Sequence, residues 1–273
     1  MDLNTIERVR AARTRADLAL APGETFLGGG TWLFSEPQPH RTGLVDLTTM
    51  GWPSIEDTPE GLRIAATCTI AELSRIPPRA GWTAHPIFHQ AATALLASFK
   101  IWNVATVGGN ICRSYAAAAM VSLAVALDAT ALIWTADGGE YTIPVERICT
   151  GNGTNRLADG DVLRRIDIPA HALRARTGFR KIALAELGRS AAVLTGRLDE
   201  SGAAVFTITA ATVCPVVLRY RELPSAARLR ADAQDAAGYY TDPMGAADWR
   251  RAVSTVLLEE IRQELVQVRP TWS

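Results

Sequence analysis

Three consecutive glycines, Gly28–Gly30, follow the short apolar run Phe26-Leu27 and precede Thr31-Trp32-Leu33. Because glycine has no Cβ atom, the backbone there can take positive φ angles, and successive N–H groups can converge on an anion such as phosphate. A tight turn is the alternative interpretation, since glycine is also the default turn residue. The triplet therefore predicts a turn whose backbone is open to close approach by a ligand.

A second glycine element, Thr106-Val107-Gly108-Gly109-Asn110, supports the ligand interpretation. It follows the apolar run Ile101–Ala105, which we expect to be a strand, and it precedes an alanine-rich helix. The same order of strand, glycine turn and helix is thus predicted twice. Two such loops could hold one pyrophosphate through their backbone N–H groups.

Neither element fits the commoner nucleotide-binding motifs. A Walker loop ends in Gly-Lys-Ser/Thr, and the first element contains no lysine. The Rossmann fingerprint G-x-G-x-x-G is met at Gly28 and Gly30 but requires a third glycine where the chain has Leu33. Both motifs are therefore rejected.

The two elements resemble the flavin-binding signatures of the FAD-binding (medium) subunit of the molybdenum hydroxylases, the family of xanthine dehydrogenase and carbon monoxide dehydrogenase. Gly28–Leu33 with Leu44–Leu47 resembles the first signature, and Thr106–Ile111 with Leu127–Ala129 resembles the second. The resemblance continues through Asp161–Leu163, Ile166–Pro169, Phe179–Lys181 and Thr209–Arg219. It covers nearly the whole chain.

The resemblance implies an α+β fold. Residues 1–170 would form a two-subdomain FAD-binding domain of the vanillyl-alcohol oxidase-like type, divided into about 1–50 and 51–170. Residues 171–273 would form a C-terminal flavoprotein domain. The pattern of the second part, β runs followed by helical stretches, independently predicts an antiparallel sheet covered by helices.

The resemblance also implies the function. FAD on this chain would pass electrons from iron–sulfur clusters on a small partner subunit to an external acceptor, while a large molybdopterin-binding subunit oxidises the substrate. A dimer of heterotrimers is expected. The implied cofactor-binding residues are Leu27, Gly28, Gly29, Gly30, Thr31, Trp32, Leu33, Thr106, Gly108, Gly109, Asn110, Leu163 and Lys181, with a weaker correspondence at Leu96. For Asn110, a helix N-cap before Ile111 is the alternative role.

Three positions depart from the family pattern. Ala119 stands where the family has an aspartate expected to bind the cofactor, Ala116 replaces a proline, and Trp102 replaces an arginine. We expect Ala119 to lie within reach of the FAD sugar chain, so these departures bear on FAD affinity and orientation more than on the fold.

The remaining elements are predicted from periodicity and turn residues. Helices are expected at 4–20, 85–100, 116–127, 225–233 and 249–267, and a short one is expected between Thr69 and Pro77-Pro78. The helix at 85–100 would bury Leu95, Leu96 and Phe99. Strands are expected at 25–27, 44–47, 62–66, 131–135, 141–144, 162–168, 179–183, 191–197 and 205–211. Thr69 and Glu72 form a predicted capping box, and Gly151–Asn155 is expected to be a surface loop.

Composition narrows the function classes. Basic and acidic residues number 28 each, so no net charge attracts nucleic acid or an anionic membrane. The N-terminus lacks a secretory signal, which predicts a cytoplasmic protein, and the apolar run Tyr115–Leu127 is too short to span a membrane. The four cysteines form no C-x-x-C pair and are expected to be isolated thiols, without a zinc or iron–sulfur site. The pair His85 and His89 could bind a metal or simply lie on a helix surface.

No Ser–His–Asp set or paired acid is evident, so no catalytic residue is assigned and the chemistry is expected to be that of the flavin. Two other functions stay open at this point. One is a self-contained flavin oxidase or reductase, and the other is a scaffold subunit that has lost its flavin, which the departures at Ala119 and Trp102 motivate.

Overall fold

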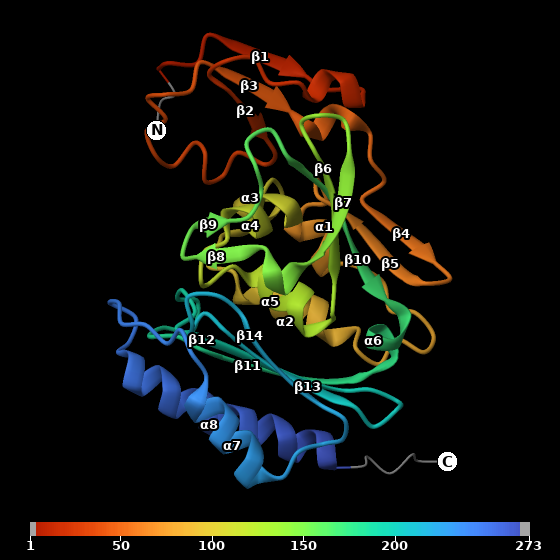
Figure 1. Ribbon diagram of the computed structural model, residues 1–273, viewed down its shortest axis with the longest axis vertical. Coiled ribbons are helices and arrows are strands. Elements are labelled where there is room, and N and C mark those ends of the chain that lie inside the picture. Colours follow the sequence, from red (N-terminus) through yellow and green to blue (C-terminus); the bar gives the residue numbers. More distant parts are fainter. Residues whose placement is uncertain (1–3, 268–273) are drawn as a thin grey trace.

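A small parallel sheet forms the N-terminal end of the molecule in the computed structural model, which describes residues 4–267 (Figure 1). Its strands, in the order β1-β3-β2, are β1 (Arg8–Ala11), β2 (Glu24–Leu27) and β3 (Gly43–Asp46). Two short 3-10 helices, η1 (Arg15–Leu18) and η2 (Leu47–Met50), follow β1 and β3. The predicted strands at 25–27 and 44–47 are confirmed.

The predicted helix over residues 4–20 is wrong. Arg8–Ala11 pairs with Gly43–Asp46 in a parallel ladder, and the side chains of Arg8 and Arg10 both reach the buried Glu24, at 3.0 and 2.8 Å. Residues two apart that point to the same side follow the period of a strand. The strand is therefore stabilised by partners far along the chain, which local periodicity does not reveal.

The middle of the molecule contains a five-stranded antiparallel sheet in the order β4-β5-β10-β6-β7. Its strands are β4 (Ile55–Thr58), β5 (Gly61–Ala65), β6 (Thr130–Trp134), β7 (Glu140–Pro144) and β10 (Val162–Pro169). All but β4 were predicted. The hairpin between β6 and β7, with Gly138 at a φ of 89°, is confirmed.

Helices cover one face of this sheet (Figure 1). They are α1 (Ile70–Ser74), α2 (Pro86–Ala94), α3 (Phe99–Trp102), α4 (Val107–Arg113), α5 (Ala119–Ala126) and α6 (Ala170–Arg174), with the 3-10 helix η3 (Val145–Arg147). The capping box before α1 is confirmed, because Thr69 Oγ1 accepts from the Glu72 N–H at 3.1 Å and Glu72 accepts from the Thr69 N–H at 2.8 Å. Every residue of α5 is buried, so this helix is the centre of the main core.

The predicted helix 85–100 is broken in two. Helix α2 ends at Ala94, whose carbonyl accepts a hydrogen bond from Ser190 Oγ at 3.2 Å. Leu95 is extended, and the chain resumes as the short α3. Leu96 and Phe99 are 58% and 71% exposed, so the expectation that they form a buried helix face is wrong.

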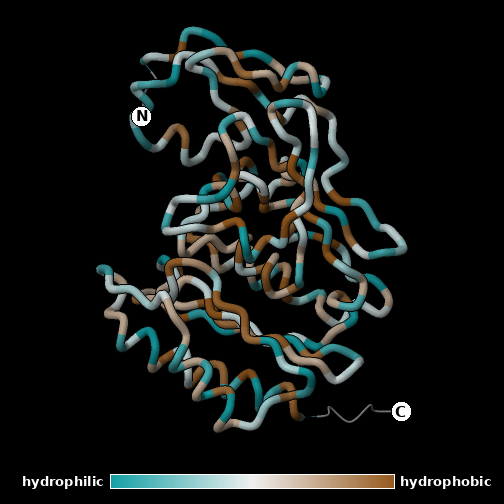
Figure 2. Tube along the Cα trace, in the orientation of Figure 1, coloured by the Kyte–Doolittle hydropathy of each residue, from teal (hydrophilic) through white to brown (hydrophobic). Residues whose placement is uncertain are grey.

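The C-terminal part forms a four-stranded antiparallel sheet in sequence order. Its strands are β11 (Arg176–Ile182), β12 (Ala192–Leu198), β13 (Ala204–Thr209) and β14 (Val216–Tyr220). Helices α7 (Ala226–Asp235) and α8 (Ala247–Val266) pack on its outer face, while α2 and α5 lie against the inner face (Figure 1). Figure 2 shows apolar residues concentrated along these strands and in the middle of the molecule. The predicted α+β fold with an antiparallel sheet covered by helices is confirmed.

Buried polar side chains form hydrogen bonds between this sheet and α5. Arg197 on β12 is buried and donates to the carbonyl of Ala126 at 3.0 Å and to Asp199 at 2.8 Å, and it also pairs with Asp128. The hydroxyls of Ser122 and Thr209 lie 2.7 Å apart in the same buried layer. The C-terminal sheet is thus fixed directly to the core helix of the preceding part.

Two of the four cysteines are joined, so the expectation of four isolated thiols is wrong. A disulfide links Cys149 in the short hairpin β8 (Cys149–Gly151) and β9 (Thr154–Asn155) to Cys214, just before β14. Cys68 and Cys112 are free. Separately, no helix within residues 4–267 is both long and apolar enough to span a membrane.

Candidate functional site

A cavity of about 700 Å³ lies between the glycine loop after β2 and the start of α4. All of Leu27–Leu33 line it, together with Thr106, Gly109 and Asn110. The two glycine elements, separate in sequence, therefore meet at one cavity. Its volume is within the usual range for cofactor and ligand pockets.

The two elements are in direct contact. An ideal Cβ atom on Gly29 would lie 1.7 Å from the carbonyl oxygen of Val104, and one on Gly28 would lie 3.0 Å from Thr106 Oγ1. A side chain at Gly29 would require the backbone to move. Glycine is needed here because two backbone segments approach each other closely.

The first glycine loop presents backbone donors to the cavity. Gly30 has a φ of 69°, and its carbonyl accepts from the Phe34 N–H at 2.8 Å, so the loop continues as turns and not as the expected helix. Within residues 4–267, none of the six N–H groups from Gly28 to Leu33 donates a hydrogen bond to another protein group. Free N–H groups in successive turn residues form a concavity suited to an anion.

The second glycine element is built differently from the prediction. Residues 101–105 are not a strand, since α3 ends at Trp102, and Gly108 and Gly109 lie inside the first turn of α4. Thr106 caps this helix by accepting from the Gly109 N–H at 3.1 Å. The N–H groups of Val107 and Gly108 donate to the carbonyls of Cys68 and Ala66 at 2.8 and 2.9 Å.

Four of the five N–H groups in this second element, those of Val107 to Asn110, therefore already donate hydrogen bonds within the protein. The expectation that both loops supply glycine N–H groups to a phosphate is wrong for the second, where only the Thr106 N–H donates to no other described group. Gly109 still faces the cavity, because a Cβ atom there would meet only Thr106 Oγ1, at 2.9 Å. Gly108 does not line the cavity, and a Cβ atom on it would lie 2.4 Å from that of Ala66.

Asn110 lines the cavity and also has a structural role. Its Oδ1 accepts from the Met120 N–H at 2.9 Å, in the first turn of α5. It therefore caps a neighbouring helix, while Thr106 caps its own. The Asn110 amide thus fixes the start of the core helix relative to the cavity wall.

The other predicted positions lie away from this cavity. Leu163 on β10 is 3% exposed and belongs to the core, and Lys181 on β11 donates to the carbonyl of Glu186 at 3.4 Å. Burial lowers the pKa of the Lys181 ammonium group. Leu96, the weaker correspondence, does line the cavity.

The three residues that depart from the family pattern lie in or against the protein core. Ala119 is the first residue of α5, is 1% exposed and does not line the cavity, so its side chain is part of the core. The Ala116 N–H donates to Asn152 Oδ1 at 3.0 Å. Trp102 packs against the main core with its indole N–H unpaired among the described residues.

Several lining residues were not predicted from the sequence, among them Arg41, Arg113 and Tyr115. Arg113 ends α4, and its Cζ lies 3.5 Å from the centroid of the Trp32 ring and 4.8 Å from that of Tyr115. None of the described lining residues is an aspartate or glutamate. The cavity is therefore positively charged, a property that neither glycine signature indicates because neither contains a basic residue.

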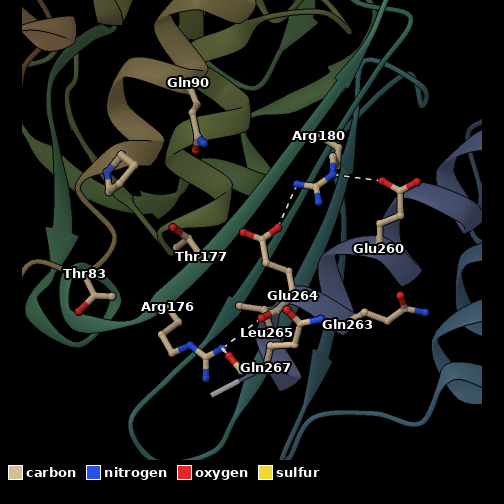
Figure 3. A pocket seen from close by; sticks show the side chains of 11 residues that line it. Thr83, Gln90, Arg176, Thr177, Arg180, Glu260, Gln263, Glu264, Leu265 and Gln267 are labelled. Atoms are coloured by element: carbon tan, nitrogen blue, oxygen red, sulfur yellow. Dashed lines mark hydrogen bonds and ion pairs between the residues drawn. The ribbon is translucent and has the colours of Figure 1, made fainter. Parts of the chain in front are cut away.

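A larger cavity, of about 970 Å³, lies between α2 and the surface formed by β11 and α8 (Figure 3). Both of its arginines already donate hydrogen bonds to protein groups. Arg180 pairs with Glu260 and Glu264 at 3.2 and 3.0 Å, and Arg176 donates to the carbonyls of Glu264 and Gln267 (Figure 3). Because two carboxylates line it and are paired with Arg180, this cavity is the poorer candidate for an anionic cofactor.

The chain belongs to a known family. The family model of the FAD binding domain in molybdopterin dehydrogenase matches residues 6–171. The predicted family is confirmed: the chain is part of an oxidoreductase, and its cofactor is FAD. The free N–H groups, the uncompensated arginines and the unpaired Trp32 indole N–H at the cavity fit a cofactor that carries a pyrophosphate.

Solved structures show the same fold over almost the whole chain. A chain of quinoline 2-oxidoreductase from Pseudomonas putida 86 is 20% identical with a TM-score of 0.79, covering 98% of this chain and 100% of its own. A chain of carbon monoxide dehydrogenase from Oligotropha carboxidovorans is 19% identical with a TM-score of 0.81, covering 96% and 98%. A chain of carbon monoxide dehydrogenase from Hydrogenophaga pseudoflava is 18% identical with a TM-score of 0.81, and the match covers 96% of this chain and 98% of that chain. Among curated proteins, none matches the sequence significantly.

Proposed function

We propose that this chain is the FAD-binding electron-transfer subunit of a heteromeric molybdenum hydroxylase. It would take electrons from iron–sulfur clusters on a small partner subunit and pass them through FAD to an external acceptor. The observation that carries this proposal is the cavity at Gly28–Leu33, with its free backbone donors and its arginines without a carboxylate. The similar structures named for quinoline oxidoreductase and carbon monoxide dehydrogenase support it.

We assign proposed roles in FAD binding to residues in and around the cavity. FAD supplies the redox chemistry through its flavin ring, and the protein binds and orients it. The N–H groups of Gly28–Leu33 would bind the pyrophosphate, Thr106 would position the loop, and Gly109 and Asn110 would form the opposite wall. By the family resemblance, Leu163 and Lys181 would lie toward the flavin ring, and Gly108 would keep α4 close to Ala66.

An exposed apolar surface beside the cavity supports the proposal that this chain binds a partner subunit. Leu96 and Phe99, with Val104 at 47%, expose large apolar side chains around α3. Contiguous exposed apolar surface commonly marks a protein interface. We propose that iron–sulfur and molybdopterin-binding subunits assemble with this chain as a dimer of heterotrimers, in the cytoplasm.

We also propose the division of the chain. Residues 1–170 would be the FAD-binding domain, with subdomains of about 1–50 and 51–170, and residues 171–273 would be the C-terminal flavoprotein domain. Residues 1–3 and 268–273 of these ranges lie outside the described residues. The change of sheet after β10 supports this boundary.

The test is purification of the tagged full chain from cells that express its partners, followed by FAD, iron and molybdenum analysis. We expect one FAD for each chain, together with iron and molybdenum on co-purified subunits. Turnover of an organic substrate by the isolated chain would instead favour a self-contained flavin oxidase. A stable complex with partners but without flavin would favour the scaffold.

A further inference from the structure

Arg113 is held in a fixed position over the first glycine loop. Its guanidinium lies over the ring of Trp32, which belongs to that loop, and over the ring of Tyr115. Arg113 Nη2 also donates to the Tyr115 hydroxyl at 2.9 Å. Stacking on aromatic faces keeps a guanidinium in place while its remaining N–H groups stay available.

The charge of Arg113 has no partner within residues 4–267. No aspartate or glutamate lies within ion-pair distance of it, and its Nε is buried without an acceptor, as is Trp32 Nε1. Buried donors in proteins nearly always have a partner. In the other cavity, by contrast, Arg180 is paired with the carboxylates of Glu260 and Glu264 (Figure 3).

The hairpin β8–β9 packs against Tyr115 and Arg113. A Cβ atom on Gly153, which has a φ of 87°, would lie 3.2 Å from a ring carbon of Tyr115 and 3.9 Å from Arg113 Nη2. On either side, Asn155 Nδ2 donates to the Cys112 carbonyl at 2.6 Å and Asn152 Oδ1 accepts from the Ala116 N–H at 3.0 Å. The position of Arg113 is therefore built into the fold before any ligand binds.

We propose that Arg113, positioned by Trp32 and Tyr115, binds the pyrophosphate of FAD and makes the site select for flavins that carry this group. The inference rests on the proposed function and deepens it. Backbone N–H groups of Gly28–Leu33 provide directional donors but no net charge. Arg113 adds the cation, whose planar donors can pair with two phosphate oxygens at once.

The test compares flavin affinities of the full-length chain after removal of its flavin. FAD and riboflavin are titrated separately into wild type, Arg113→Met and Arg113→Lys, with circular dichroism to verify folding. For Arg113→Met we expect the FAD dissociation constant to rise roughly 10- to 100-fold, with a weaker dependence on salt. Riboflavin affinity should stay within about twofold, and Arg113→Lys should be intermediate because it keeps the charge but loses the planar donors.

Arg13→Met is the matched control, since it removes an exposed arginine outside the cavity. It should leave both affinities unchanged. Wild-type FAD affinity in Arg113→Met, or equal losses of affinity for FAD and riboflavin, would overturn the proposed role of Arg113 but not the proposed function of the chain. A wild-type chain that bound no FAD would overturn the proposed function as well.

Discussion

A Cβ atom on Gly29 would lie 1.7 Å from the carbonyl oxygen of Val104, so the two glycine elements touch through their backbones. This contact brings the free N–H groups of Gly28–Leu33 to the cavity that α4 closes on its other side. It makes the geometry of the candidate pyrophosphate site depend on one glycine.

Replacing Gly29 with alanine should therefore weaken FAD binding more than it weakens the fold. The alanine methyl group must displace either the loop or residues 104–105, which moves the N–H groups by a fraction of an ångström or more. We expect FAD affinity to fall at least roughly tenfold, a change of about 1.4 kcal/mol. FAD titration and thermal unfolding of the same preparation measure the two effects.

Gly108→Ala is the matched control. Its methyl group would meet Ala66 in the packing of α4 against the sheet, outside the cavity. It should lower the melting temperature with a smaller effect on FAD. If both variants lost FAD in proportion to their loss of stability, Gly29 would have only a packing role.

Gly109→Asp should prevent the retention of FAD while leaving the fold largely intact. Gly109 lies in the first turn of α4, where an acidic residue suits the helix dipole, and the space at its Cβ position is limited only by Thr106 Oγ1. The new carboxylate would face the cofactor phosphates as a like charge. Gly109→Asn adds the same bulk without charge and should retain more FAD; purification of Gly109→Asp with a normal flavin content would disprove this assignment.

Glu24 should control the stability of the N-terminal sheet in acid. Hydrogen bonds from Arg10, above all, and from the Ala21 N–H lower the pKa of Glu24 from 4.5 to about 2. Because the folded-state pKa is the lower one, the stabilisation is complete above pH 4.5 and is lost as the pH falls toward 2. Glu24→Gln should lower the unfolding free energy at pH 7 by about 1–3 kcal/mol.

Glu36→Gln, which changes an exposed glutamate without an ion pair among the described residues, is the control for that effect. The difference in stability between Glu24→Gln and wild type should shrink between pH 4.5 and pH 2 in chemical unfolding experiments. A difference that stayed constant over this range would show that the Glu24 carboxylate contributes nothing as an anion.

The disulfide between Cys149 and Cys214 can be tested by counting thiols. Burial raises the pKa of Cys68 and Cys112 to about 12, so alkylation should be carried out on unfolded protein without reductant. We expect two modified cysteines by mass spectrometry and four after reduction. Four modified cysteines before reduction would mean that Cys149 and Cys214 remain thiols, as is usual in the cytoplasm.

Cys149→Ser then measures the contribution of the link to stability. The bond closes a loop across a sequence separation of 65 residues, for which stabilisation of about 2–4 kcal/mol is typical. The melting temperature of Cys149→Ser without reductant should match that of reduced wild type.

Much of the fold follows from local sequence patterns. The strands β5, β6, β7, β10, β12 and β13 were predicted because apolar and β-branched runs are separated by turn residues such as Asp137-Gly138. Strand β1 was missed because its stability comes from Glu24 and from pairing with β3, both distant in sequence. The apolar run at 101–105 was assigned to a strand, although Ala105 donates to the carbonyl of Ile101 at 2.7 Å and closes a helical turn.

The candidate site was predicted in part. The glycines of both elements indicated where the chain approaches itself or a ligand closely, and Gly28–Gly30, Thr106 and Gly109 do meet at one cavity. Which N–H groups stay free depends on acceptors such as Ala66 and Cys68 in another segment. The role of Arg113 depends on Trp32, far earlier in the chain, so no local motif could indicate it.

FAD binding at this cavity is tested most directly by titrating FAD into the flavin-free full-length chain, alone and in its assembled complex, and following the change in flavin absorbance. We expect saturable binding at one FAD for each chain, lost or strongly weakened in Gly29→Ala and Arg113→Met. The absence of saturable FAD binding in both forms of the wild-type protein would contradict this expectation.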